Sequence, residues 1–161
     1  MPDWISHILL GLIIAELLNV KKKSLVVLGS ILPDIILKTY TLALLTPVPL
    51  NFMFWFFYPL HTIAGVLLFS FLLTLIFQYD AKKTFLLVSI GAVFHILLDM
   101  TTKPILYNIQ GLLLFPFSWQ AYSIGLFYSE QYWIVLLILL GIYLIIKLIG
   151  KLHLRNINKS N

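Results

Sequence analysis

The sequence predicts an all-α membrane protein, a polytopic bundle of about five transmembrane helices. Two observations support this fold class. Hydrophobic residues fill 61% of the 161 positions and charged residues only 11%, so a water-soluble fold of this size could not bury its apolar side chains. The apolar residues also fall in runs long enough to cross a bilayer about 30 Å thick, with short lysine-rich or proline-containing stretches between them.

The expected helices follow one another in a single integral membrane domain that covers residues 1–161. The five candidate spans are at about residues 4–20, 24–45, 53–78, 83–101 and 131–152. The first is short for a complete crossing, and residues 153–161 form a basic tail after the last span. The chain has no cysteine, which excludes disulfides, thiolate nucleophiles and cysteine-rich zinc sites.

The basic residues predict how these helices are oriented. Nine of the eleven lysine and arginine residues follow the first span, precede the fourth or follow the fifth, and five alternating spans put these places on one side. The positive-inside rule makes that side cytoplasmic, with the N-terminus outside and the C-terminus inside. We therefore expect a multi-pass protein of the plasma or inner membrane. The positive charge lies at helix ends, which argues against a nucleic-acid partner.

Five ionisable residues interrupt the apolar runs and form the candidate site: His7, Asp34, His61, His95 and Asp99. An ionisable side chain in hydrocarbon is costly, so it usually marks a functional site. A rise of about 1.5 Å per helical residue puts all five between about 16 and 26 Å above the lysine-rich side, in the outer half of the bilayer. Because His and Asp are common zinc ligands, this agreement in depth predicts a buried metal site.

Each of these residues also has a simpler interpretation when taken alone. His95 and Asp99 lie four residues apart on one helix face, which suits two ligands of one ion or a local hydrogen bond. Asp34 follows Pro33, where a bend would aim it inward, or where a helix would end at the interface. His61 follows an aromatic stretch and would alone be read as an interfacial histidine.

Small residues recur one helical turn from the candidate ligands. Gly11, Gly65, Gly91 and Ser30 each lie four residues from one of them. Small side chains let membrane helices approach closely, and a ligand cluster drawn from several helices requires that approach.

Other charged residues are expected outside the site. Asp3 should cap the first helix, with a role as an outer ligand as the lesser alternative. Glu16 lies close to Lys21 and Lys22, and it should either pair with them or extend its carboxylate to the interface rather than serve as a ligand. Lys38 and Lys103 lie toward the outer side, where they would either anchor the chain at the interface or attract an anionic headgroup.

The order of these motifs resembles a known family. The segments at 1–7 (MPDWISH), 32–34 (LPD), 59–62 (PLHT) and 95–99 (HILLD), followed by 114–118 (LFPFS), resemble the LexA-regulated, membrane-bound metal-dependent hydrolase family over residues 1–120. A more distant similarity is to zinc-dependent phospholipase C. It implies one zinc held by His61, His95, Asp99 and Asp34, and a second held by His7 with Asp99 bridging. Nothing matches that family's further ligands after Asp99, so one or two divalent ions, expected to be zinc, are implied.

The sequence thus predicts a metal-dependent hydrolase that uses a metal-activated water on an ester or phosphoester bond. The depth of the site favours a lipid or lipid-linked substrate that enters from the outer leaflet. Asp34 and Asp99 are the candidate catalytic residues, because either could orient the water or take its proton. Arg155, the only arginine, lies in the basic tail, so an anionic substrate would depend on the metal and on Lys38 or Lys103.

Two other functions also fit the sequence. Buried His and Asp residues also line the paths of metal-ion and proton transporters. A noncatalytic membrane protein with a structural metal is the other alternative. The five candidate residues are predicted to lie in one half of the bilayer, which favours a single binding site over a transport path across the membrane. The sequence leaves the oligomeric state open.

Overall fold

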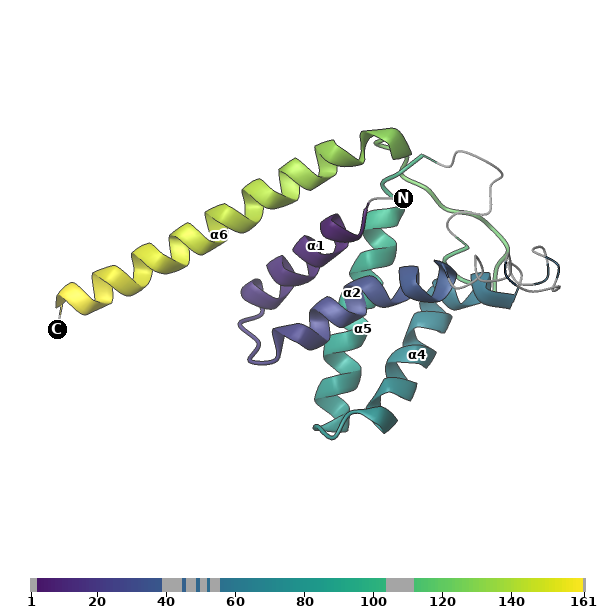
Figure 1. Cartoon of the computed structure of the whole chain (residues 1–161), viewed down its shortest axis with the longest axis horizontal. Helices are drawn as coiled ribbons and strands as arrows, with labels where there is room; N and C mark the ends of the chain where they lie inside the picture. The colour runs from purple at the N-terminus through teal and green to yellow at the C-terminus, as the bar shows by residue number, and fades with distance from the viewer. Residues whose placement is uncertain are drawn as a thin grey trace.

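The computed structural model describes residues 3–38, 45, 49, 52, 56–103 and 112–160, without the side chains of residues 36–38 and 153–160. Over this part of the chain the fold is all-helical, which confirms the all-α part of the prediction. Its five α-helices are α1 (Trp4–Leu17), α2 (Lys23–Lys38), α4 (Ile63–Ile76), α5 (Ala81–Asp99) and α6 (Tyr132–Ser160) (Figure 1). Two short 3-10 helices, η2 (Tyr58–His61) and η3 (Ser129–Gln131), precede α4 and α6.

The N-terminal helix pair forms much as the sequence predicts. Asp3 caps α1, because its Oδ1 accepts a hydrogen bond from the Ser6 backbone N–H at 2.7 Å. Asn19, with a φ of 48°, then supplies the left-handed residue that lets the chain turn into α2. α2 runs on through Pro33 to Lys38, and residues 39–44 of the expected second span lie outside the described residues.

The expected helix over residues 53–78 is wrong as a single element within the described residues. The chain forms η2, then breaks at Thr62, whose backbone is extended (φ −123°, ψ 169°). The Thr62 side chain accepts a hydrogen bond from the Gly65 backbone N–H at 3.2 Å and so caps α4. α4 therefore begins at Ile63, and η2 carries His61 at the helix entrance rather than inside a long helix.

Glycines allow α2 to lie directly against α1 and α5. A Cβ at Gly91 would collide with the Val26 carbonyl oxygen, and one at Gly29 would collide with the backbone of Val88. Figure 1 shows α2 crossing α5. On the other side of α2, a Cβ at Gly11 would collide with the Ser30 hydroxyl. The predicted close approach is therefore confirmed for these helices.

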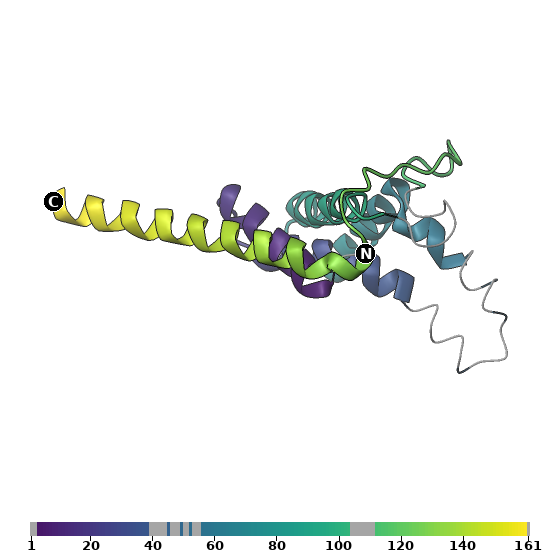
Figure 2. The ribbon, with the colours of Figure 1, turned by 90° about the horizontal axis from the view of Figure 1, so that it is seen from above.

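Within the described residues, two helical stretches are long and apolar enough to cross a membrane by length and composition: Ala81–Asp99 and Ser129–Leu152. α1 and α4 are apolar but have only 14 residues each. The two longer stretches differ in their surroundings, because 44% of the first and 11% of the second is buried inside the fold. α5 is therefore an internal helix, and α6 lies at the periphery and extends beyond the other helices (Figure 2).

α6 docks on α1 along a single seam. Ile13 of α1 packs in one buried cluster with Val135 and Leu139 of α6. Further along both helices, the Lys147 ammonium donates to the Glu16 carboxylate. Later residues of α1 thus meet later residues of α6, so the two helices run in the same direction.

Candidate metal centre

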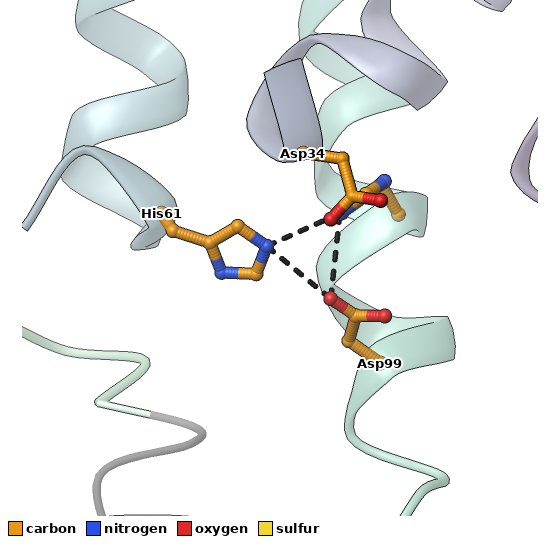
Figure 3. Close-up of side chains that lie close together, drawn as sticks. Asp34, His61 and Asp99 are labelled. Atoms are coloured by element: carbon orange, nitrogen blue, oxygen red, sulfur yellow. Dashed lines mark hydrogen bonds and ion pairs between the residues drawn. The ribbon is translucent and has the colours of Figure 1, made fainter. Parts of the chain in front are cut away.

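Four side chains from three elements converge on one point. Asp34 from α2, His61 from η2, and His95 and Asp99 from α5 each offer one ligand atom, and all four atoms lie within 4.8 Å of one another. The side chains of Asp34 and His95 are fully buried, and those of His61 and Asp99 are 10% exposed. Figure 3 shows Asp34, His61 and Asp99 pointing toward one another.

The separations between these atoms suit a small divalent ion. Asp99 Oδ2 lies 3.2 Å from His61 Nε2 and 3.4 Å from His95 Nε2, and the two imidazole nitrogens are 3.2 Å apart. Asp34 Oδ1 lies 3.8 Å from His95 Nε2. Ligands bound to zinc at about 2.0–2.1 Å in a tetrahedron lie about 3.3 Å from one another. The four residues therefore form a donor set of the right type and nearly the right size.

A backbone contact fixes which nitrogen of His95 faces the cluster. Its Nδ1 lies 2.7 Å from the Ser30 carbonyl oxygen of α2. Because a carbonyl only accepts, Nδ1 carries the hydrogen and donates it. The neutral ring then presents the lone pair of Nε2 toward Asp34, His61 and Asp99. A metal-bound histidine is typically held in this way by its second nitrogen.

Asp99 is the residue that contacts all three histidines. Its Oδ2 faces His61 and His95, and its Oδ1 lies 3.3 Å from His7 Nε2. Neither oxygen has a hydrogen-bonding partner among the described residues, although both are buried. Burying a carboxylate that completes no hydrogen bond is costly, and a cation between the carboxylate and these imidazoles would compensate for that cost.

His7 lies beside the four-residue group rather than within it. Its ring is fully buried and stacks on that of His95, with ring centroids 3.8 Å apart and an interplanar angle of 22°. All five residues singled out from the sequence are thus brought together. Asp99 places one oxygen toward the main group and the other toward His7.

The fold explains how Asp34 and His61 reach this point. The prediction that Asp34 points inward from a continuing helix is confirmed, because α2 extends four residues beyond it and the side chain is only 1% exposed. The carbonyl of Gly29 loses its helical donor at Pro33, as expected for a proline inside a helix. His61 is the last residue of η2, and the break at Thr62 turns its ring toward α5.

The opposite end of the molecule holds solvated charges instead. The Glu16 carboxylate accepts from Lys23, at 2.7 Å, and from Lys147. Sequence reasoning expected its partner among the nearby lysines and missed Lys147, which is 131 positions away. Asp80 caps α5 by accepting from the Lys83 backbone N–H at 3.0 Å, and this bond holds the pKa of Asp80 below its ordinary value.

Residues 1–158 match the family model described as the YdjM inner membrane protein. The chain belongs to this family. Its description agrees with the membrane association predicted from composition and with the LexA-regulated membrane family named from the motifs. No curated protein and no solved structure matches the chain.

Proposed function

We propose that this member of the YdjM family is a membrane-embedded, metal-dependent hydrolase that cleaves an ester or phosphoester bond of a lipid or lipid-linked substrate. The observation that carries the proposal is the convergence of two buried carboxylates and two imidazoles from α2, η2 and α5. A fold stabilised by apolar packing alone gains nothing from burying such groups together, since each is costly to desolvate.

Asp34, His61, His95 and Asp99 would hold the ion, and zinc fits their nitrogen and oxygen donors. When bound, such an ion polarises the substrate oxygen and makes water a better nucleophile near neutral pH. His7 and the second oxygen of Asp99 offer donors for a second ion.

Different residues of the chain would position the ligands, accept a proton and orient an imidazole ring. Asp99 contacts three histidines and is best suited to fix the ligands. Asp34 Oδ1 lies 3.8 Å from His95 Nε2 and is suited to accept the proton of the attacking water. The Ser30 carbonyl holds the His95 ring in its ligating orientation.

The surroundings of the site favour a lipid substrate. His61 and Asp99 are its partly exposed members, so access lies on their side. The Leu113 carbonyl accepts from the Ile63 backbone N–H, two residues after His61, and places the loop at 114–119 nearby. Leu114, Phe117 and Trp119 of that loop are 46%, 91% and 67% exposed, a surface that suits acyl chains better than water.

The proposal includes a five-span topology, with the N-terminus outside, the C-terminus in the cytoplasm and the metal centre in the outer half of the bilayer. The lysine distribution supports it. Because the chain contains no cysteine, single cysteines at exposed Asn19, Gln120 and Lys151 can be labelled in intact cells without reaction at a second site of the chain. An impermeant maleimide should label Gln120→Cys only. Labelling of Asn19→Cys or Lys151→Cys from outside would contradict this topology.

Purified protein and a panel of lipid esters test the activity. The wild type should carry a divalent ion and hydrolyse at least one phosphomonoester, phosphodiester or carboxylic ester of a lipid. His95→Ala should lose both the ion and the turnover, whereas Lys82→Ala, at the opposite end, should keep both. Turnover that survives in His95→Ala, or that persists after complete chelation, would refute the assignment. Metal flux into proteoliposomes without any lipid turnover would support transport instead.

A further inference from the structure

Lys103 differs in position from the other lysines whose side chains the structure describes. Seven lysines lie at the end of the molecule away from the metal centre, in the turns between α1 and α2 and between α4 and α5, and on the later part of α6; they are Lys21, Lys22, Lys23, Lys82, Lys83, Lys147 and Lys151. Lys103 alone follows the C-terminal end of α5. It is four residues beyond Asp99, so its backbone lies within about 13 Å of that ligand.

Backbone hydrogen bonds fix Lys103 relative to the metal centre. The Asp99 carbonyl oxygen accepts from both the backbone N–H and the hydroxyl of Thr102, at 3.0 and 2.7 Å. The next backbone N–H, that of Lys103, donates to the Phe127 carbonyl at 2.6 Å. The chain at 124–127 also donates to the carbonyls of Met100 and Thr101. The backbone of Lys103 is therefore held in place by hydrogen bonds to the chain at 124–127.

The side chain of Lys103 is held as well. Its stem runs beside Gly125, whose φ of 64° suits glycine, and a Cβ there would lie 3.4 Å from Lys103 Cγ. Its ammonium lies 4.1 Å from the ring centroid of Tyr128. In the described part of the chain no carboxylate pairs with this ammonium, whereas Lys23, Lys83 and Lys147 all pair with one.

The net charge of the metal centre suggests a role for the Lys103 ammonium. The carboxylates of Asp34 and Asp99 cancel the two positive charges of one divalent ion, and neutral imidazoles add none. A neutral centre in a poorly hydrated site gives an anionic substrate no net attraction. A phosphate group needs a further positive charge close by.

Building on the proposed function, we infer that Lys103, held over Tyr128, binds the phosphate group of an anionic lipid headgroup at the metal centre. The substrate class is then a phosphate-bearing lipid rather than a neutral ester. The ammonium contacts the phosphate directly, and Tyr128 fixes its position. If Lys103 only anchored the chain at the membrane interface, replacing it would not change which headgroup the protein binds.

Isothermal titration of the zinc-loaded protein in detergent tests this inference. The probes are dihexanoyl phosphatidic acid, dihexanoylglycerol and inorganic phosphate. Lys103→Met should weaken phosphatidate binding by roughly tenfold or more, because a charge-assisted hydrogen bond is lost. It should leave dihexanoylglycerol binding unchanged. Lys103→Arg should retain most of the affinity, and Lys82→Met is the matched control.

Two further measurements separate the possible outcomes. Tyr128→Phe keeps the ring and should bind phosphatidate like the wild type, which shows that the turn tolerates substitution. Zinc content is measured on every sample, and Lys103→Met should keep its zinc. Wild-type phosphatidate affinity in zinc-loaded Lys103→Met would overturn the inference and leave the proposed hydrolase standing. A wild type that holds no zinc would refute the hydrolase, and the inference with it. If the protein binds inorganic phosphate as tightly as phosphatidate, and both affinities depend on Lys103, the ligand is free phosphate and not a lipid headgroup.

Discussion

α5 and α6 are the two helices of the described chain with the length and composition to cross a membrane, yet they differ in almost every other respect. α5 is packed between α2 and α4 and carries His95 and Asp99. α6 touches the bundle along one seam on α1 and carries no member of the metal group. A Cβ on Gly91 of α5 would collide with α2, whereas one on Gly141 of α6 would meet nothing within 4 Å.

The contrast shows that hydrophobicity alone does not locate function in a membrane protein. The more apolar of the two stretches is Ser129–Leu152, which holds most of α6, with a mean hydropathy of 2.6 against 1.6 for α5. The lower value of α5 reflects the polar and small residues that its contacts require, since small residues permit close packing and polar ones form the site. Substitutions on the two helices should therefore have unequal consequences.

The largest effect is expected from Asp99→Ala on α5. This change removes the carboxylate that faces His7, His61 and His95, so three buried imidazoles lose their shared partner. Metal affinity should fall by about a hundredfold or more, and hydrolysis should fall to background. Zinc titration with a competing chelator measures the affinity. Wild-type affinity in this variant would remove Asp99 from the ligand set.

The next largest effect is expected from Gly91→Ala, with Gly141→Ala as its counterpart on α6. The new methyl group at 91 would press on the Val26 carbonyl and the Ser30 backbone, so α2 must move and the contact from Ser30 to His95 is disturbed. We expect a loss of about 1–3 kcal/mol in the free energy of unfolding, with weaker metal binding. Gly141→Ala should be neutral or slightly stabilising. Equal effects in a denaturant titration would contradict the comparison.

Leu139→Ala tests whether α6 supports the fold without supporting the chemistry. Leu139 is 7% exposed and packs with Ile13 and Val135. Its truncation should cost about 2 kcal/mol, near the low end for buried leucines, because lipid can partly replace the lost contacts. Zinc affinity per folded molecule should not change. A matched loss of affinity would mean that α6 positions the site after all.

Glu16→Gln should have the smallest effect. It removes the pairs with Lys23 and Lys147 that link the ends of α1, α2 and α6. Exposed ion pairs contribute little, so we expect the melting temperature to fall by about 2 °C or less, and less still in high salt. A large, salt-insensitive drop in melting temperature would show that the Glu16 pairs contribute more to stability than an exposed ion pair does.

Much of the site was predictable because polar residues are conspicuous in apolar sequence. His95 and Asp99 could be placed on one helix face from their spacing, and an estimate of depth brought Asp34, His61 and His7 to the same level. The structure groups all five. Spacing also predicted the close approach at Gly91, because only small residues permit it.

Other features could not be read from the sequence, for identifiable reasons. The break at Thr62 depends on a local cap that competes with a continuous apolar run, so the run alone suggested a longer helix. The Ser30 carbonyl that orients His95 is a backbone group and leaves no residue-specific signal. The Lys147 partner of Glu16 follows only from the way α6 docks on α1.

X-ray absorption of the zinc-supplemented, purified protein tests most directly whether α2, η2 and α5 share one cation. We expect at least one ion per chain, with nitrogen and oxygen neighbours at about 2.0–2.1 Å and the outer-shell scattering of imidazole. In His61→Ala the imidazole scattering should weaken. A folded wild-type protein that binds no zinc or other divalent ion above background, or binds it with a spectrum unchanged in both His61→Ala and His95→Ala, would contradict the central claim.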